Sequence, residues 1–179
     1  MRGLLAFGRA IDAMSAAAGK LADWLVLFAC LISSGNAGVR YLFSYSSNAF
    51  LEIQWYLFGA LVFLGASYTL QMNEHVRVDL VYSSVSDRTR LWIDALGFSL
   101  FFLPVTLYLT WLSVPFAQQS VVSQEQSSNA GGLILWPIKL MVPIGFALLT
   151  LQGVSELIKR VAALQGDVTL DTHYEKPLQ

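Results

Sequence analysis

The stretch NEHVRVDL at positions 73–80 places Glu74, His75, Arg77 and Asp79 within eight residues. Carboxylates and histidine are residue types that bind metal ions or transfer protons. A metal site would need more ligands than this exposed turn supplies. Arg77 and Asp79 are two residues apart, so in an extended turn they share a face with His75 and can bind each other or a partner protein. We therefore expect an assembly role here, and neither a catalytic site nor a metal site.

The rest of the chain also lacks a residue set for catalysis or for binding a cofactor. The single cysteine, Cys30, lies in an apolar run, where a free cysteine acts as a small packing residue. His75 and His173 fall outside the apolar runs, so neither is placed as an axial ligand for a membrane haem. No Ser–His–Asp set and no glycine-rich phosphate loop is present. We expect no enzyme activity and no cofactor.

The composition is too apolar for a protein dissolved in water. The 179 residues are 55% apolar and 13% charged, with a mean hydropathy of +0.56. Soluble domains carry about 25% charged residues. The formal net charge is −1 and no basic block is present to neutralise phosphates, which argues against a nucleic-acid partner. Membrane lipid is therefore the expected surrounding.

Four apolar segments are long enough to cross a bilayer as helices, which takes about 20 residues. Pro137 lies at the start of one segment, where proline is tolerated, whereas Pro104 and Pro143 are expected to kink their helices. The predicted fold class is an all-α membrane protein with four transmembrane helices and an additional N-terminal helix. The expected spans are 21–43, 50–72, 91–116 and 133–158.

The basic residues predict which side of the membrane each segment faces. With the N-terminus inside, nine of the eleven Lys and Arg residues are cytoplasmic and only Arg40 and Lys139 are outside. Such a bias is typical of helical membrane proteins. Both termini are therefore expected in the cytoplasm. All five tryptophans lie near predicted helix ends, as headgroup-layer residues do: Trp24, Trp55, Trp92, Trp111 and Trp136.

The segments that flank the spans are predicted to be a surface helix and a tail. Arg9 and Asp12 interrupt the uncharged core that a cleaved signal peptide requires. We expect an amphipathic helix along the inner membrane surface over residues 1–19, with a frayed tail as the open alternative. A membrane domain follows over 20–160 and a polar cytoplasmic tail over 161–179. The apolar stripe of the surface helix consists of Leu4, Phe7, Ile11, Met14 and Ala18.

Arg40 and Glu52 flank the short loop between the first two spans and carry opposite charges. A charge costs about 2.5–3.5 kcal/mol at the centre of a membrane helix and less near the interface. A hairpin that joins opposite charges reduces this cost. We expect a structural clasp, within the chain or to a partner, and favour it over proton relay. Lys139 lies at the same level, where it is expected to snorkel or to join the cluster.

Small residues predict close helix contacts in the first two spans. Ser34 and Gly38 are four residues apart on the first span, with Asn36 on an adjoining face. Gly59 and Ala66 are seven residues apart on the second span, so this span also carries a stripe of small residues. Such residues let membrane helices approach closely. Packing within this chain and packing against an external partner both remain open.

The run EIQWYLFGALVFLGASYTLQMNEHVRVDL resembles the small membrane subunit, of DctQ type, of tripartite ATP-independent periplasmic (TRAP) transporters. The likeness rests on Arg40–Tyr41 ending the first span, Glu52 and Trp55 starting the second, and HVRVD just after it. The last span adds LWPIKLMVPIGFALLTLQG. The resemblance covers about residues 20–165, and HVRVD at its position is fairly specific.

The resemblance implies a function. Such systems import organic acids with a sodium gradient, using a periplasmic binding protein, a large membrane subunit (DctM type) that holds the substrate and ion sites, and a small subunit. The small subunit implied here is a non-transporting scaffold that anchors the elevator-type large subunit in the bacterial inner membrane. The central thirds of the four predicted spans contain no Asp, Glu, Lys or Arg, which agrees with a scaffold.

Two other classes of protein remain open. A self-sufficient small four-helix transporter working as an oligomer would need a coupling carboxylate, and Glu52 lies too near an interface for that role. A membrane-anchored assembly protein unrelated to transport is the third class. Neighbouring genes for a large membrane protein and a secreted binding protein would distinguish the TRAP interpretation from both.

Overall fold

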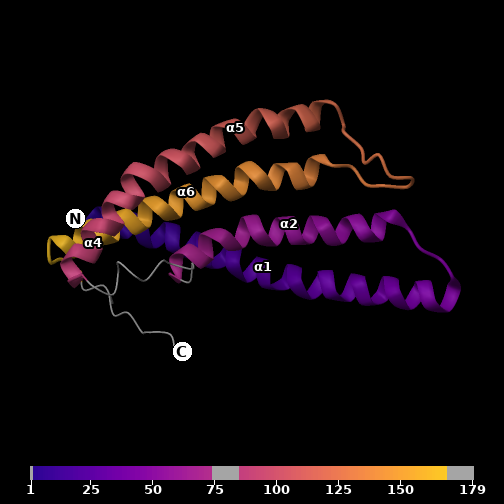
Figure 1. The fold of residues 1–179 in the computed structure, drawn as a ribbon, viewed down its shortest axis with the longest axis horizontal. Coiled ribbons are helices and arrows are strands. Elements are labelled where there is room, and N and C mark those ends of the chain that lie inside the picture. The colour runs from indigo at the N-terminus through magenta and orange to yellow at the C-terminus, as the bar shows by residue number, and fades with distance from the viewer. Residues whose placement is uncertain (1, 74–84, 169–179) are drawn as a thin grey trace.

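The computed structural model describes residues 2–73 and 85–168, which form a bundle of long helices (Figure 1). This part of the chain contains no strand, only an isolated bridge between Gln126 and Ile134. Four helical runs are long and apolar enough to cross a membrane, which confirms the predicted all-α membrane fold. The elements are α1 (Arg2–Phe43), α2 (Asn48–Gln71), α4 (Asp87–Gly97), the π-helical turn η1 (Phe98–Phe102), α5 (Leu103–Val122) and α6 (Trp136–Leu164).

The first helix is longer than the sequence predicted. α1 has 42 residues, or about 63 Å at 1.5 Å per residue, against about 30 Å for the hydrocarbon core of a bilayer. The separate surface helix expected over residues 1–19 is therefore not an element of its own. No proline or helix cap interrupts the chain there, and the buried face of Gly8, Ile11, Ser15 and Gly19 runs straight into the first span. The position of this segment relative to a membrane stays a prediction.

The third span contains a local irregularity at the place where a proline was expected to disturb it. α4, η1 and α5 form one run from Asp87 to Val122. The π-turn ends just before Pro104, whose nitrogen has no proton for the preceding turn. The Leu103 N–H reaches back to the Phe98 carbonyl instead. Pro143, the other expected kink, lies within the continuous helix α6.

The interior of the bundle is made of small and polar residues. α6 packs against α1, α2, α4 and α5, and its buried positions include Gly145, Thr150, Gln152 and Gly153. Most large apolar side chains point outward instead. Leu4, Phe7 and Met14 of the predicted α1 stripe are exposed, and only Ile11 of these four is buried. Membrane helices pack in this way because lipid, unlike water, does not drive apolar side chains inward.

Glycines set the closest helix approaches. A Cβ at Gly145 would lie 2.5 Å from the Phe63 side chain, and one at Gly153 would lie 2.6 Å from Phe102. On α2, a Cβ at Gly59 would lie 2.8 Å from Ile138, so the small stripe of the second span packs within this chain. Gly38 of α1 has nothing within 4 Å of such a Cβ. The small face of the first span is therefore open.

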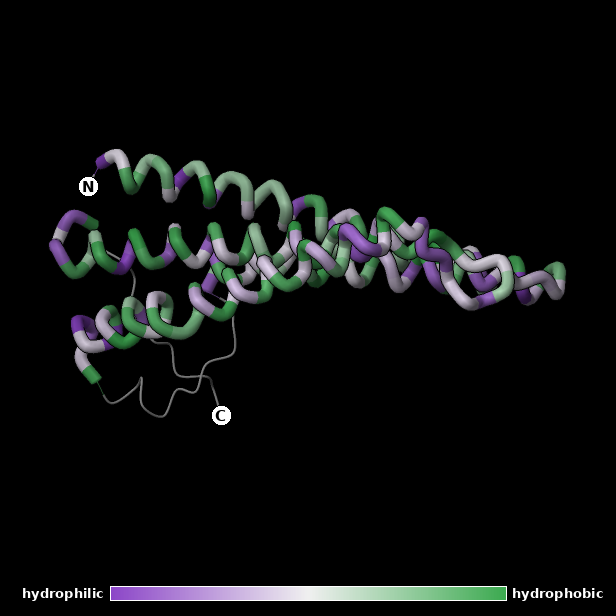
Figure 2. The backbone as a smooth tube through the Cα atoms, turned by 90° about the horizontal axis from the view of Figure 1, so that it is seen from above, coloured by the Kyte–Doolittle hydropathy of each residue, from purple (hydrophilic) through white to green (hydrophobic). Residues whose placement is uncertain are grey.

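The bundle has two distinct ends (Figure 1). The loop end holds the connections 44–47 and 123–135. The N-terminal end is where α1 begins and α6 finishes, next to α4. Figure 2 shows the bundle narrow at the loop end and broader at the N-terminal end. Polar side chains gather at both ends, and they form the candidate site described next.

Candidate functional site at the two ends of the bundle

Glu52 binds a loop through its carboxylate. It lies in the second turn of α2, and the Leu133 N–H donates to Oε2 at 2.6 Å. The Asn129 side-chain amide donates to Oε1 at 2.8 Å, and the Ser127 hydroxyl donates to the same oxygen. The three donors come from the 123–135 loop, which crosses over the start of α2. This arrangement fastens the loop to the helix without any cation.

Two further hydrogen bonds fasten the same loop to α2. The Asn48 side-chain amide donates to the Ala130 carbonyl at 3.0 Å, and the Tyr56 hydroxyl donates to the Ile134 carbonyl at 3.0 Å. Gly132 has no room for a side chain, since a Cβ there would be 2.6 Å from the Ser127 Cβ. The loop and the first turns of α2 are thus one hydrogen-bonded unit.

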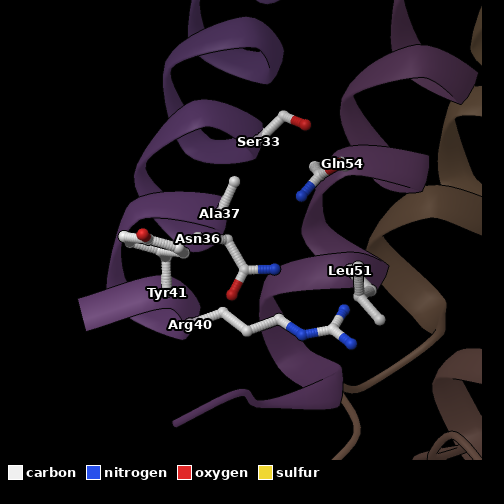
Figure 3. Close-up of a pocket in the computed structure, with 7 residues that line it drawn as sticks. All are labelled: Ser33, Asn36, Ala37, Arg40, Tyr41, Leu51 and Gln54. Atoms are coloured by element: carbon white, nitrogen blue, oxygen red, sulfur yellow. The ribbon is translucent and has the colours of Figure 1, made fainter. Parts of the chain in front are cut away.

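Arg40 does not pair with Glu52, so the clasp expected within the chain is not formed. Within the described residues, 2–73 and 85–168, no ion pair includes Arg40. Its side chain extends from the last turn of α1 across a groove toward Leu51 of α2 (Figure 3). The short loop brings the two helices together, but Glu52 is turned toward the 123–135 loop. A clasp between Arg40 and a partner stays a prediction.

Lys139 pairs with a carboxylate that the sequence analysis did not single out. Its Nζ lies 2.5 Å from Oε2 of Glu125, and 4.6 Å from the centre of the Phe116 ring. Glu125 lies in the loop after α5. The hydrogen bond from Lys139 holds the pKa of Glu125 below its ordinary value, with a further contribution from Ser120. Lys139 thus joins the loop end, although it does not contact Glu52.

The remaining predicted site residues lie apart from these contacts or outside the described residues. Trp55 of α2 is 78% exposed, and its location in the headgroup layer stays a prediction. His75, Arg77 and Asp79 fall in the segment 74–84, which lies outside the described residues. Their assembly role stays a prediction.

The N-terminal end contains a polar network that the sequence analysis missed. Oδ1 of Asp12 on α1 accepts hydrogen bonds from Gln152, Ser155 and Lys159 of α6, each at 2.9 Å. The Ser15 hydroxyl donates to the Gln152 carbonyl oxygen at 2.7 Å. Gln152 and Ser155 have no exposed surface. These contacts tie the first half of α1 to the last half of α6.

The same network continues into α4 through Arg160. Its Nε lies 3.0 Å from Oδ2 of Asp94, and its Nη1 pairs with Glu156 one turn earlier on α6. Glu156 also accepts from Lys159 at 2.7 Å. The Arg160 guanidinium stacks 4.6 Å above the Phe98 ring of the π-turn. With both Arg160 and Glu156 at 6% exposure, this is a buried charge network that joins three helices.

A sequence signal for this network exists in α6. Gln152, Ser155, Glu156, Lys159 and Arg160 recur at three- and four-residue steps, so they occupy one face of a helix. The partner residue Asp12 carries no such signal, because it is 147 positions from Lys159. Among residues 2–73 and 85–168, no group of three or more His, Cys, Asp or Glu side chains is placed to hold a metal ion.

The chain matches a known protein family over most of its length. The family model for the DctQ component of tripartite ATP-independent periplasmic transporters matches residues 29–163, well over half of the chain. The chain belongs to the DctQ family. It is therefore a component of a TRAP transporter and, with four helices of membrane-spanning length, a multi-pass membrane protein. Comparisons with curated proteins and with solved structures gave no match.

The two polar clusters differ in how far they fall within the range that the DctQ family model matches. Arg40, Glu52, Trp55 and Lys139 all lie within the matched range, as does the α6 part of the N-terminal network. Asp12 lies before it. The loop end is thus wholly within the family region, whereas the N-terminal end combines family residues with the first half of α1.

Proposed function

We propose that this DctQ protein is a non-transporting scaffold in a sodium-coupled TRAP importer. It anchors a large DctM-type subunit, which moves an organic acid delivered by a periplasmic binding protein across the bacterial inner membrane. Family membership supports the transport system as a whole. The location of the charges supports the scaffold role within it.

The observation that carries the scaffold role is the separation of charge from the middle of the bundle. The central thirds of the predicted spans hold no Asp, Glu, Lys or Arg. Glu52, the carboxylate that a self-sufficient transporter would need, is occupied by donors from Ser127, Asn129 and Leu133. A carboxylate that couples transport must exchange a proton or an ion during each cycle. Glu52 is better suited to holding a loop.

The open small face of α1 supports attachment to a larger partner. A Cβ added at Gly35 or Gly38 would have nothing within 4 Å, although small residues at this spacing are typical of helix contacts in membranes. We propose that this face, together with the HVRVD segment, contacts the large subunit. With the N-terminal end in the cytoplasm, as the basic residues predict, the loop end faces the periplasm.

The decisive experiment is reconstitution in liposomes. This chain alone should give no uptake of any organic acid, whereas the chain with its large subunit and binding protein should give uptake that depends on a sodium gradient. Uptake by the purified chain alone would contradict the scaffold role. Uptake by the large subunit and binding protein at an undiminished rate without this chain would contradict it as well.

A further inference from the structure

A groove runs between α1 and α2 at the loop end. Its volume is about 530 Å³, and both polar and apolar side chains line it. Figure 3 shows the α1 side chains on one side and those of α2 on the other, with Arg40 across the mouth. The lining side chains used below are Ser33, Asn36, Arg40, Leu51 and Gln54.

Two groups in the groove have unused hydrogen-bonding capacity. Arg40 takes part in none of the ion pairs among the described residues, and the adjacent carboxylate, Glu52, is directed at the 123–135 loop. The side-chain oxygen of Asn36 is buried without a hydrogen-bond partner. Buried polar atoms are nearly always satisfied by protein, water or a ligand. The groove therefore has the properties of a site that is completed by another molecule.

The polarity of the groove changes in a defined order along α1. Arg40 lies in the last turn of the helix, Asn36 lies one turn deeper, and Ser33 lies about two turns deeper. Beyond Ser33, α1 is apolar from Ile32 back to Trp24. From its mouth inward, the groove thus offers a cation, then neutral hydrogen-bonding groups, and then apolar side chains.

We propose that this groove binds a phospholipid, with the phosphate on Arg40 and the glycerol-ester region beside Asn36 and Ser33. The planar guanidinium binds phosphate oxygens with two parallel hydrogen bonds. Ester oxygens accept hydrogen bonds, so the Asn36 amide N–H and the Ser33 hydroxyl are the donors at the depth of the phospholipid ester groups, and the buried Asn36 oxygen is left to a water molecule. The apolar stretch follows at the depth of the acyl chains. A volume of about 530 Å³ suits a bound small molecule.

Phospholipid fits this groove better than an acidic side chain of a partner subunit. A single carboxylate would pair with Arg40 but would offer no acceptor to the Asn36 amide N–H and the Ser33 hydroxyl, one and two turns deeper. The exposed aromatic residue Tyr41 lines the groove next to Arg40, and such rings are typical of the headgroup layer. Arg40 is therefore placed at phosphate depth.

The test measures phospholipid retained by the full-length chain after purification in mild detergent. Native mass spectrometry should show phospholipid bound to the wild-type chain, and R40Q should lower that occupancy at least tenfold. Arg40→Lys, which keeps the charge without the planar fork, should lower it less. After delipidation, phosphatidylglycerol and phosphatidylethanolamine should each bind again, whereas diacylglycerol, which has no phosphate, should not.

A matched steric pair tests the groove without changing charge. Ala37 lines the groove, whereas its neighbour Gly38 faces open space. Ala37→Leu should displace the lipid, and Gly38→Leu, which adds even more bulk to the same helix, should leave retention unchanged. Size-exclusion chromatography of each variant establishes that a loss of lipid is not a loss of fold.

Three results would overturn the proposal. The first is wild-type phospholipid occupancy in R40Q, and the second is equal occupancy in Ala37→Leu and Gly38→Leu. The third is a wild-type chain that binds no phospholipid while R40Q loses only its co-purification with the large subunit, which would assign Arg40 to a partner carboxylate. Lipid retention is measured on the chain alone, so the first two results leave the scaffold proposal untouched, and the third would agree with it.

Discussion

Glu52 at the loop end and the carboxylates at the N-terminal end are satisfied by different means, although the loop end also contains the ion pair between Lys139 and Glu125. At the loop end, Glu52 accepts hydrogen bonds from neutral donors, all from one loop. At the N-terminal end, Asp12 and Glu156 are held by Lys159 and Arg160 as well as by neutral groups. The first arrangement fixes a loop to one helix, and the second fixes α1, α4 and α6 to each other.

This difference indicates what each end can tolerate. Removing a partner from a buried charge network leaves an uncompensated charge, which is among the most costly changes in a protein. Replacing a neutral donor to a partly exposed carboxylate leaves a group that water can still reach. We therefore expect the N-terminal end to be the more sensitive to substitution and the loop end to respond mainly to steric changes.

The largest effect is expected at Arg160. Arg160→Ala removes a cation that pairs with both Glu156 and Asp94, and breaking a buried pair in this way costs about 3–5 kcal/mol of unfolding free energy. Denaturation in mixed micelles would measure it. Arg88→Ala, at an exposed position on α4, is the control and should change stability by less than about 0.5 kcal/mol. Equal losses in the two variants would show that the network contributes no more than a surface arginine.

A smaller loss is expected from Gly132→Ala at the loop end. Its Cβ would lie 2.6 Å from the Ser127 Cβ and 2.9 Å from Oε1 of Glu52, so the loop must shift, at a cost of about 1–3 kcal/mol. Limited proteolysis within 123–135 should become faster. Gly38→Ala, on an open face of α1, is the matched control and should leave proteolysis unchanged. Unchanged proteolysis in Gly132→Ala would mean that the loop does not depend on its contact with Glu52.

A double-mutant cycle on Arg40 and Glu52 tests whether the two side chains interact, as the sequence predicts, or lie in separate surroundings, as the structure shows. The sequence predicts that Arg40→Ala and Glu52→Ala partly compensate each other. The structure gives these residues different surroundings, so their effects on unfolding free energy should add to within about 0.5 kcal/mol. A coupling well above that value would restore the clasp between the two.

The smallest effect is expected from acidification at Glu125. Lys139 lowers the pKa of this carboxyl in the folded chain, so the ion pair stabilises the fold fully above the ordinary pKa of 4.5. Its contribution falls as the pH drops through the lowered pKa, because the unfolded chain then binds more protons. Wild type should exceed Glu125→Gln in stability at pH 7 and match it in strong acid. A difference that does not depend on pH would exclude this pair as its cause.

Prediction from sequence succeeded for the helices and for the close packing at Gly59, but it missed the polar contacts between distant segments. The four spans follow from length and apolarity alone, which depend only on neighbouring residues. The pair Arg40 and Glu52 was chosen because the residues are close in sequence, but the donors to Glu52 lie 75 to 81 positions away. The sequence indicated only that Asp12 is a charge that a signal peptide would exclude, because no neighbouring residue points to its contact with Lys159.

The uninterrupted course of α1 has a mechanical consequence. Between Arg2 and Ser33, α1 contains no proline and no adjacent Gly/Ser pair, which are the usual causes of a sharp kink. The part of α1 beside α2 and the part beside the end of α6 therefore move as one lever. A tilt of the portion within the bilayer would be carried to the segment around Arg2 and Arg9, beyond the end of α2. The length of this rod would enlarge the displacement at its tip, and a partner seated there would sense the inclination of the membrane span.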